Sequence, residues 1–347
     1  MVRITPRAAA ARWLDRRPGR ILIGVSGGAD STALCIAAAE ELEGRGIAPA
    51  SRIIVAHYNH RLRAEPEHRR DLEQVRAVAS RRGLPVVIDA AAPQELVGEA
   101  QGSGGLESAA RRARHAFFER SCRLVGASTI WTAHTADDQQ ETVLMRLLAG
   151  VTSPLLAGIP EERTTDTGVL VCRPLLRTSR EHVERFLHER GICWSEDATN
   201  RATRFRRNRT RLEVLPAVEQ IWPAVRNDLL RLAEATGVRA DTARARAKQV
   251  PTTVMPGIAL VDRGAFYTLG RDARLELLYT VLQRAGLLSR RDRPSHRFFN
   301  PLLGPDPGGK RTLVHARGLY MGLSNSRLLI VGRIVRPRQS GYLRGIG

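Results

Sequence analysis

The stretch from Ile21 to Thr32 contains the residues of this chain that are best suited by type and spacing to chemistry. An uncharged run rich in β-branched residues predicts a buried strand, and a helical pattern runs from Thr32 to Leu42. The turn between them permits close backbone approach and offers hydroxyls beside unpaired helical N–H groups, so it is suited to holding a phosphate. It lacks both GxxxxGK[ST] and GxGxxG, and a glycine-rich turn without a ligand is the alternative. The turn consists of Ser26, Gly27, Gly28, Ala29, Asp30 and Ser31.

Acidic side chains gather further along the chain. Asp137 and Glu141 are four residues apart in a predicted helix, so both carboxylates project from one face, and His134 comes just before the first turn. A solvated acidic helix start would look similar, because carboxylates favour the N-terminal turn. Beside a phosphate loop, however, clustered carboxylates are suited to Mg²⁺ or an ammonium group, and we favour that interpretation.

A basic segment spans residues 201–211. A flexible, solvated linker would have this composition, but so would a contact with an RNA backbone, where each neutralised phosphate releases counterions. The six arginines of this segment are Arg201, Arg204, Arg206, Arg207, Arg209 and Arg211.

The elements that must position these residues alternate between strands and helices, which predicts an α/β fold with a doubly wound, mostly parallel sheet. Such sheets bind ligands at the carboxyl ends of their strands, where Ser26, His57 and His134 are found. The predicted strands after Val25 are 52–57, 85–89, 128–133 and 169–176, and the predicted helices are 65–82, 106–122, 136–149 and 178–190. Thr178 and Glu181 form a capping-box pattern at the start of the last helix.

The rest of the chain predicts a smaller, mainly helical C-terminal domain. Helical patterns continue from Pro216 to about Gln249 and again over 271–285, and residues 312–331 have the pattern of a hairpin. We therefore expect a catalytic domain over 1–215, a mainly helical substrate-binding domain over 216–335, and a disordered basic tail over 336–347. The glycine-rich residues 98–105 are a candidate mobile loop.

Composition narrows the class of protein. The net charge of +20 over 347 residues indicates a polyanionic partner, most simply nucleic acid. No stretch approaches the roughly 20 apolar residues of a membrane span, and the N-terminus lacks the apolar core of a signal peptide, so we expect a soluble cytoplasmic protein. The four cysteines form no CxxC, which argues against a disulfide scaffold or a zinc knuckle. A monomer and a homodimer both stay open.

Five motifs in order resemble the tRNA(Ile)-lysidine synthetase family of the PP-loop ATP pyrophosphatase superfamily. The resemblance covers about Ile21 to Trp222, and it implies an adenine nucleotide alpha hydrolase-like fold. These motifs are the SGGADS loop, His57-Tyr-Asn-His60-Arg-Leu-Arg63, Gly105-Leu-Glu-Ser-Ala-Ala-Arg111-Arg-Ala-Arg114-His115, Thr132-Ala-His134-Thr-Ala-Asp137-Asp138-Gln-Gln-Glu141-Thr142, and a bipartite element from Arg173-Pro-Leu-Leu through Trp194 and Asn200 to Arg207-Asn208-Arg-Thr-Arg211 and Pro216.

The resemblance implies a reaction and a role for each matching residue. These enzymes use ATP to adenylate the C2 oxygen of the wobble cytidine in an isoleucine tRNA with a CAU anticodon, releasing pyrophosphate. The ε-amine of free lysine then displaces AMP. The implied ATP-binding residues are Ser26, Gly27, Gly28, Asp30, Ser31, Thr32 and His57, with Asp30 also as the ligand of Mg²⁺. The implied catalytic residues are Asp30, Arg111, His134, Asp137 and Glu141; lysine would bind Asp137, Asp138 and Glu141, and tRNA would bind Arg201, Arg204, Arg207, Asn208 and Arg211.

Some positions depart from the family pattern. His115 replaces a common Tyr, Thr135 replaces a frequent second His, and Val151-Thr-Ser-Pro replaces a Gly-rich segment. Two rival functions stay open. A tRNA 2-thiolation enzyme of the same superfamily would be expected to carry paired cysteines, and a non-catalytic tRNA-binding relative would be expected to lose Asp30, Asp137 and Glu141.

Overall fold

The computed structural model describes residues 4–62, 65–91, 105–151, 155–165, 167–195, 206–288, 296–309, 311–316 and 318–332. The predicted mobile loop, apart from Gly105, and the predicted tail lie outside these residues. The chain forms two compact units, Met1–Gly150 with Gly158–Ala233, and Val151–Ala157 with Glu234–Gly347. The first unit therefore extends beyond the expected boundary at 215, because Leu215 packs in one apolar cluster with Val143 and Leu229.

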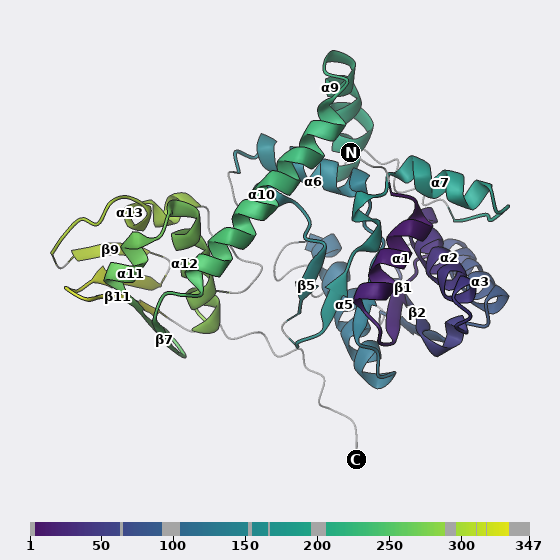
Figure 1. Ribbon diagram of the computed structural model, residues 1–347, viewed down its shortest axis with the longest axis horizontal. Coiled ribbons are helices and arrows are strands. Elements are labelled where there is room, and N and C mark those ends of the chain that lie inside the picture. Colours follow the sequence, from purple (N-terminus) through teal and green to yellow (C-terminus); the bar gives the residue numbers. More distant parts are fainter. Residues whose placement is uncertain are drawn as a thin grey trace. The chain divides into compact units, whose positions relative to one another are not determined.

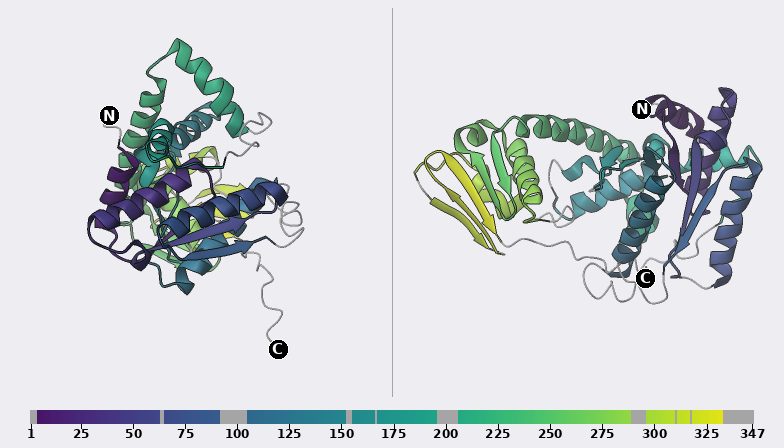
Figure 2. Two further views of the ribbon diagram at one scale, coloured as in Figure 1. Left: turned by 90° about the vertical axis from the view of Figure 1, so that its right-hand side faces the viewer. Right: turned by 90° about the horizontal axis from the view of Figure 1, so that it is seen from below.

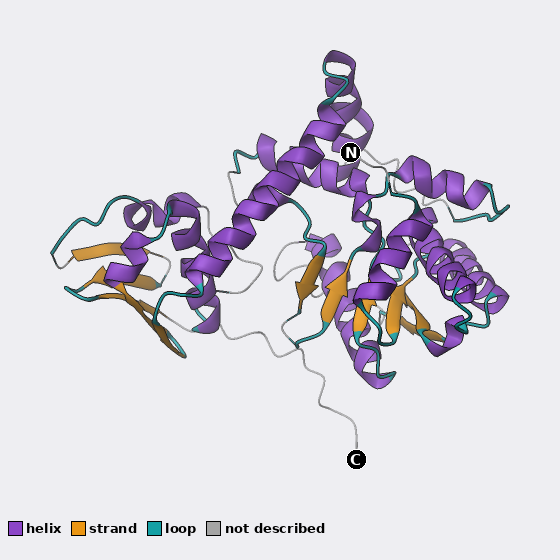
Figure 3. Cartoon of the chain, viewed as in Figure 1, coloured by secondary structure: helices purple, strands orange, loops and turns teal. Residues whose placement is uncertain are grey.

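The first unit is built on a six-stranded sheet in the order β3-β2-β1-β4-β6-β5 (Figures 1 and 3). All neighbouring strands are parallel except β5, which pairs antiparallel with β6. The strand order reverses at β1, between β2 and β4, so the loops after β1 and β4 share the position where such sheets bind ligands. The strands are β1 Ile21–Gly24, β2 Ile53–Asn59, β3 Val86–Ala90, β4 Thr129–Trp131, β5 Glu162–Thr164 and β6 Leu170–Cys172.

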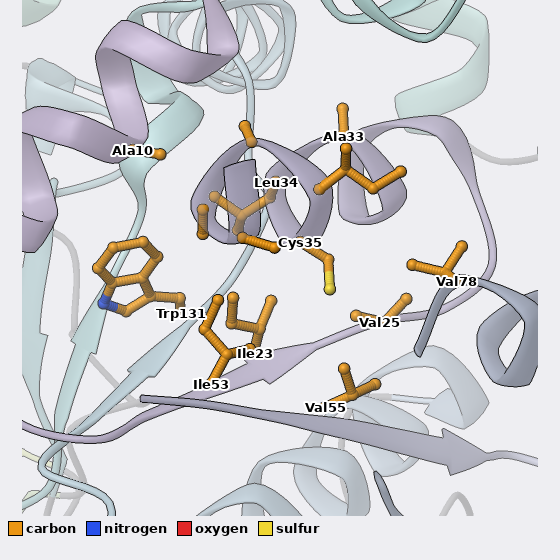
Figure 4. Close-up of a cluster of buried hydrophobic side chains, with 14 of the residues drawn as sticks. Ala10, Ile23, Val25, Ala33, Leu34, Cys35, Ile53, Val55, Val78 and Trp131 are labelled. Carbon is orange, nitrogen blue, oxygen red and sulfur yellow. The ribbon is translucent and has the colours of Figure 1, made fainter. Parts of the chain in front are cut away.

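Helices cover both faces of this sheet, which explains why its central strands contain no charged residue. Alternate residues of β1 enter different cores: Ile21 and Ile23 pack with Trp131 and Leu34, as Figure 4 shows in part, whereas Leu22 packs with Phe118 on the other face. The first core is completed by α1 Pro6–Arg16, α2 Ala29–Gly44, α3 Glu65–Arg81 and α7 Arg180–His188, and the second by α5 Gly105–Leu124.

The ends of two helices differ from the sequence-based expectation. Helix α1, which the alanine- and arginine-rich N-terminus had not suggested, begins at Pro6 after an N-cap by Thr5. At α7 the predicted cap was wrong by one residue: Ser179 is the N-cap and its hydroxyl accepts from the His182 N–H, while Thr178 is fully buried. The remaining helices of this unit are α6 Ala136–Leu148, α8 Arg206–Arg209, a π-helical turn Thr210–Val214 and α9 Leu215–Ile221, followed by α10 Val225–Ala247, which continues into the second unit as one unbroken helix (Figure 2).

The second unit contains a five-stranded antiparallel sheet in the order β7-β8-β11-β10-β9. Among the described residues of 216–332, helices contain more residues than strands, but of this sheet the sequence had indicated only the hairpin within 312–331. Its core includes Phe266, Leu278 and Ile330. The elements are β7 Thr252–Met255, β8 Ile258–Asp262, α11 Arg263–Thr268, α12 Arg271–Arg284, α13 Asn300–Leu303, β9 Arg311–Ala316, β10 Leu319–Leu323 and β11 Arg327–Gly332. Across the described part of the chain, every helix is too short or too polar to span a membrane.

Candidate active site

The loop between β1 and α2 has the geometry of an anion-binding turn. Gly27 has a φ of 94°, a conformation that favours glycine. Gly28 is the N-cap of α2, and no described side chain caps the N–H groups that follow. The Ser31 hydroxyl donates to the Gly28 carbonyl and accepts from the Ser26 N–H, each at 3.1 Å. The uncapped end of a long helix thus faces a turn whose shape is already fixed, which suits a phosphate.

Two residues with no role predicted from the sequence hold Gly27 in place. A Cβ atom on Gly27 would lie 3.1 Å from the carbonyl oxygen of Asp71 in α3, so only glycine fits without displacing that helix. The Ser195 N–H donates to the Gly27 carbonyl at 3.0 Å. The Ser195 hydroxyl also donates to the Asp71 carboxylate at 2.6 Å. Ser195 directly follows Trp194 of the fifth motif, and this motif was the one feature of the sequence that pointed to its neighbourhood. No motif includes Asp71.

Asp30 lies in the first turn of α2, and its Oδ1 atom is buried without a hydrogen-bond partner among the described residues. Burial, together with the nearby Asp138, raises the pKa of this carboxyl to about 7 against the opposing effect of Arg180. A carboxylate oxygen of this kind, beside a phosphate-binding turn, is suited to bind Mg²⁺. Proteins commonly hold this ion with one or two carboxylates and the phosphates of the substrate. The described residues contain no group of three or more His, Cys, Asp or Glu arranged to hold a metal alone.

Two other predicted ATP-binding residues are buried behind the loop. Thr32 is fully buried, and its hydroxyl has no hydrogen-bond partner within the described chain. His57 is buried at the end of β2, where its Nδ1 atom lies 2.9 Å from the carbonyl oxygen of Val25. This contact fixes the backbone directly before the phosphate turn.

The carboxylates of α6 lie at the carboxyl end of β4, the strand next to β1. Thr135 is the N-cap, and Asp138 completes a capping box by accepting the Thr135 N–H at 2.8 Å. Asp137 accepts the backbone N–H of Arg180 at 2.8 Å, and its other oxygen lies 3.6 Å from the Arg226 guanidinium. The exposed fraction of the side chain falls from 25% at Asp137 to 14% at Asp138 and 1% at Glu141.

Two predicted tRNA-binding arginines bind these predicted lysine-binding carboxylates. Arg207 donates from Nε to Glu141 at 2.8 Å and from Nη2 to Asp138 at 2.6 Å. Arg211 donates from Nε to the other oxygen of Glu141 at 2.5 Å. Glu141 is thus a buried carboxylate held between two guanidinium groups. Nothing in the spacing of the sequence indicates this pairing, which joins residues 66 and 70 positions apart.

His134 lies between β4 and α6, and its Nδ1 atom is 3.1 Å from the Thr132 hydroxyl. Burial, together with the nearby Arg173 and Arg111, lowers the pKa of this imidazole to about 3, and Asp138 opposes the shift. The ring is therefore neutral at ordinary pH. It can position a substrate by a hydrogen bond, but it is a weak base.

Several arginines are electrostatic neighbours of His134, and two of them, Arg111 and Arg173, also lower the pKa of a second histidine, His115. Arg173 is almost fully buried, its Nη1 atom donates to the Pro160 carbonyl at 2.8 Å, and its Nε atom has no partner among the described residues. Burial lowers the pKa of Arg173 and of Arg114 to about 10. Burial, with the neighbouring arginines, lowers the pKa of His115 to about 3. Arg111 is exposed on α5. This concentration of positive charge favours a bound anion.

The other predicted tRNA-binding residues are only partly described. Arg201 and Arg204 lie outside the described residues. Asn208 is half-buried in α8, between the two arginines that bind Glu141.

Comparison with known proteins agrees with this geometry. A family model described as a PP-loop domain matches residues 5–218. The tRNA(Ile)-lysidine synthase of Thermus thermophilus is 40% identical over 237 residues, which are 68% of this chain and 42% of that protein. The enzyme of the same name from Rhodopirellula baltica is 40% identical over 235 residues, covering 62% and 58%. The one from Burkholderia mallei is 34% identical over 269 residues, covering 77% and 52%. The chain thus spans about half the length of these curated relatives.

A solved structure has the same fold. The U34-tRNA thiolase NcsA from Methanococcus maripaludis superposes with a TM-score of 0.53 at 14% identity, over 66% of this chain and 77% of that one. At that identity, the likeness concerns the fold alone.

Proposed function

Because the chain belongs to the PP-loop domain family, we propose that it is an ATP-dependent ligase that joins free lysine to C2 of the wobble cytidine of isoleucine tRNA with a CAU anticodon. The observation that carries the proposal is the meeting of an anion-binding turn after β1 with the carboxylates of α6 after β4, in a chain 40% identical to two tRNA(Ile)-lysidine synthases. One site thus offers groups for a phosphate and groups for an ammonium.

The phosphate turn takes the β- and γ-phosphates of ATP in this proposal. The N–H groups at the start of α2 and the Ser26 and Ser31 hydroxyls bind the oxygens of the leaving pyrophosphate. Asp30 holds Mg²⁺, which when bound supplies positive charge against those phosphates. The C2 oxygen of the cytidine attacks the α-phosphorus, and pyrophosphate leaves. Arg111 supports the charge on the α-phosphate through its planar guanidinium.

The second half of the reaction uses α6. Adenylation turns the C2 oxygen into a good leaving group, so the ε-amine of lysine attacks C2 and AMP departs. We assign the first contact of the lysine ammonium to Asp137, because it is the most exposed of the three carboxylates. Asp138 and Glu141 are the other two carboxylates proposed for the lysine site, and their contacts with Arg207 and Arg211 fix their positions. Neutral His134 positions the cytidine by a hydrogen bond.

The tRNA contact is proposed for the basic segment 201–211, with the exposed Arg206 and Arg209 as direct phosphate contacts and with Arg207 and Arg211 held by the carboxylates of α6. The ligand is the anticodon loop, because a single-stranded loop lets the cytidine leave its stack and enter the site. Free lysine, ATP and tRNA are all cytoplasmic molecules, so we propose a cytoplasmic location. The thiolation alternative is less favoured because the four cysteines are far apart in the sequence and form no CxxC pair, and because Cys35, Cys122 and Cys172 are buried.

The decisive experiment supplies purified protein with ATP, labelled lysine and isoleucine tRNA bearing a CAU anticodon. We expect label in the tRNA, with one AMP and one pyrophosphate released for each lysine joined. A tRNA with the anticodon GAU is the matched control and should take up none. If the protein is folded and binds the CAU tRNA but joins no lysine to it, the proposal is wrong.

Asp30→Asn separates the chemistry from tRNA recognition. The amide keeps the shape of the side chain but removes the charge proposed to hold Mg²⁺, so turnover should fall at least a hundredfold while the tRNA dissociation constant stays within twofold. Filter binding and the lysine-incorporation assay measure the two quantities. Equal loss of both would argue against this role for Asp30.

A further inference from the structure

The helical segment 206–221 contains one π-helical turn between two α-helical parts. Arg206–Arg209 and Leu215–Ile221 are α-helical, whereas Thr210–Val214 form the wider turn, with the Leu215 N–H donating to the carbonyl of Thr210 five residues earlier. Such insertions are rare and occur often at functional sites. This one contains Arg211, a residue that binds Glu141.

The residue that follows the turn explains it. Pro216 is the second residue of α9 and lies within the continuous helical run. Proline has no N–H, and its ring collides with the carbonyl four residues earlier, here that of Leu212. A wider turn directly before the proline moves that carbonyl away. The Thr210 hydroxyl also donates to the Arg206 carbonyl at 2.9 Å. Because a contact of this kind bends helices, it is a second candidate cause of the π-helical turn and is tested below.

The turn changes which residues share a face. Arg207 and Leu215 are eight residues apart, and in a regular helix they would point about 80° apart, at about 100° per residue. A π-helical turn absorbs one residue, which reduces this angle to about 20°. Arg207, Arg211 and Leu215 then all face α6. The two arginines bind Asp138 and Glu141, while Leu215 packs with Val143 and Leu144.

We propose that Pro216 is a positioning residue for the active site: it enforces the turn at Thr210–Val214, and the turn seats Arg207 and Arg211 on the carboxylates of α6 while Leu215 is anchored in the apolar cluster. The inference rests on the proposed function only where a loss of activity is interpreted. The contacts of Arg207 and Arg211 with the carboxylates of α6 can be measured without turnover.

The first test is a double-mutant cycle between Arg211→Met and Glu141→Gln, in which the measured quantity is the thermal midpoint of unfolding. The cycle is made once in the wild type and once in the Pro216→Ala variant. In the wild type, the double variant should lose clearly less than the sum of the two single losses, because the residues are in contact. With alanine at 216 the run can become a regular helix, and the non-additive part should fall by at least half. Alanine is favoured over proline inside a helix, and this gain opposes the loss of the ion pairs, so the midpoint of Pro216→Ala should stay close to that of the wild type.

Control variants separate the alternatives. Pro223→Ala removes an exposed proline outside the turn and should leave the coupling unchanged. Thr210→Ala keeps Pro216 and should retain most of the coupling. Unchanged coupling in Pro216→Ala, or loss of coupling in Thr210→Ala alone, would overturn the proposal.

The second test uses lysine incorporation. Pro216→Ala should lower kcat more than tenfold with the KM for ATP changed less than threefold, because the phosphate turn is untouched. Deleting the exposed Leu212 in the same variant places Arg207 and Leu215 seven residues apart, which restores a common face in a regular helix. This deletion should recover kcat to within threefold of the wild type, and no recovery would contradict the proposal. If the wild type itself is inactive, the proposed function fails, but the coupling experiment still decides the role of Pro216.

Discussion

Glu141 illustrates how closely charges are matched at the level of single residues. Its carboxylate is 1% exposed and binds two arginines, each of which is still about one-third or one-quarter exposed. Glu141→Gln removes the carboxylate that both guanidinium groups share and leaves them to Asp138, which lies 2.6 Å from Arg207 and 3.6 Å from Arg211. We expect the free energy of unfolding to fall by about 2 kcal/mol, below the usual cost of breaking a fully buried pair because water still reaches the arginines. Urea denaturation measures this change.

A matched control is Glu181→Gln on α7. Glu181 binds Arg185 at 2.7 Å, but its side chain is 62% exposed. Its loss should cost no more than about 0.5 kcal/mol. Similar losses at both positions would show that burial does not matter to the Glu141 pair.

His115 gives a prediction for pH. Burial and the surrounding arginines lower its pKa from the usual 6.5 to about 3 in the folded protein. Between these values the unfolded chain binds a proton that the folded protein does not, so stability is lost as the pH falls. His115 should therefore contribute a loss of about 1.4 kcal/mol per pH unit from pH 6 to pH 4. The difference in unfolding free energy between wild type and His115→Gln, measured at each pH, isolates this contribution. A difference that does not vary with pH would contradict it.

Among the elements, the turn between β1 and α2 depends most on one residue. Gly27→Ala puts a Cβ atom 3.1 Å from the Asp71 carbonyl oxygen at a φ of 94°. The conformation alone costs roughly 1–2 kcal/mol for a residue with a side chain. Since α3 must also move, we expect ATP to bind at least tenfold more weakly, as measured by calorimetry.

Gly46→Ala is the control for this substitution. Gly46 has a φ of 71° but nothing within 4 Å of an added Cβ, so it suffers the same backbone penalty without the crowding. It should lose stability yet bind ATP normally. Weaker ATP binding in this variant would mean that the backbone penalty, rather than the contact with Asp71, is responsible.

The central elements could be predicted from the sequence because their signals are local. The uncharged strand at Ile21, the alternation of strands and helices and the apolar periodicity of α6 all follow from the immediate neighbours of each residue. Strand β5 escaped prediction because it is three residues long and polar, and its place depends on pairing with β6. In the second sheet, β7 and β8 escaped prediction because they are four and five residues long and β8 joins the rest of the sheet by pairing with β11, far along the chain.

The site was predictable as a set of residues but not as a set of contacts. Motif spacing located the phosphate turn and the acidic helix. It did not show that Arg207 and Arg211 bind Glu141, because charge patterns in two distant segments contain no information about their distance in space. The same limit hid the contact between Asp71 and Ser195, which are 124 residues apart.

At the scale of the whole molecule, the net charge of +20 predicts salt-dependent binding of tRNA. Each phosphate contact to a single strand contributes about −0.7 to the slope of log affinity against log salt. Arg206 is exposed, so Arg206→Gln should reduce the slope by about 0.7. Arg207→Gln should change it much less, because its charge is already matched by Asp138 and Glu141. Binding titrations at several salt concentrations would detect the difference, and equal changes would mean that Arg207 leaves its carboxylates to bind RNA.

The pairing of Glu141 with Arg207 and Arg211 also has a consequence for the order of folding. The carboxylates of α6 leave the ribosome well before their arginines, which follow 66 and 70 residues later. Until then, a carboxylate destined for burial has no counter-charge and must stay in water. The first turns of α6 can therefore pack fully only after α8 and the π-helical turn have been synthesised. The buried contacts of Glu141 are thus among the last parts of the first unit to form.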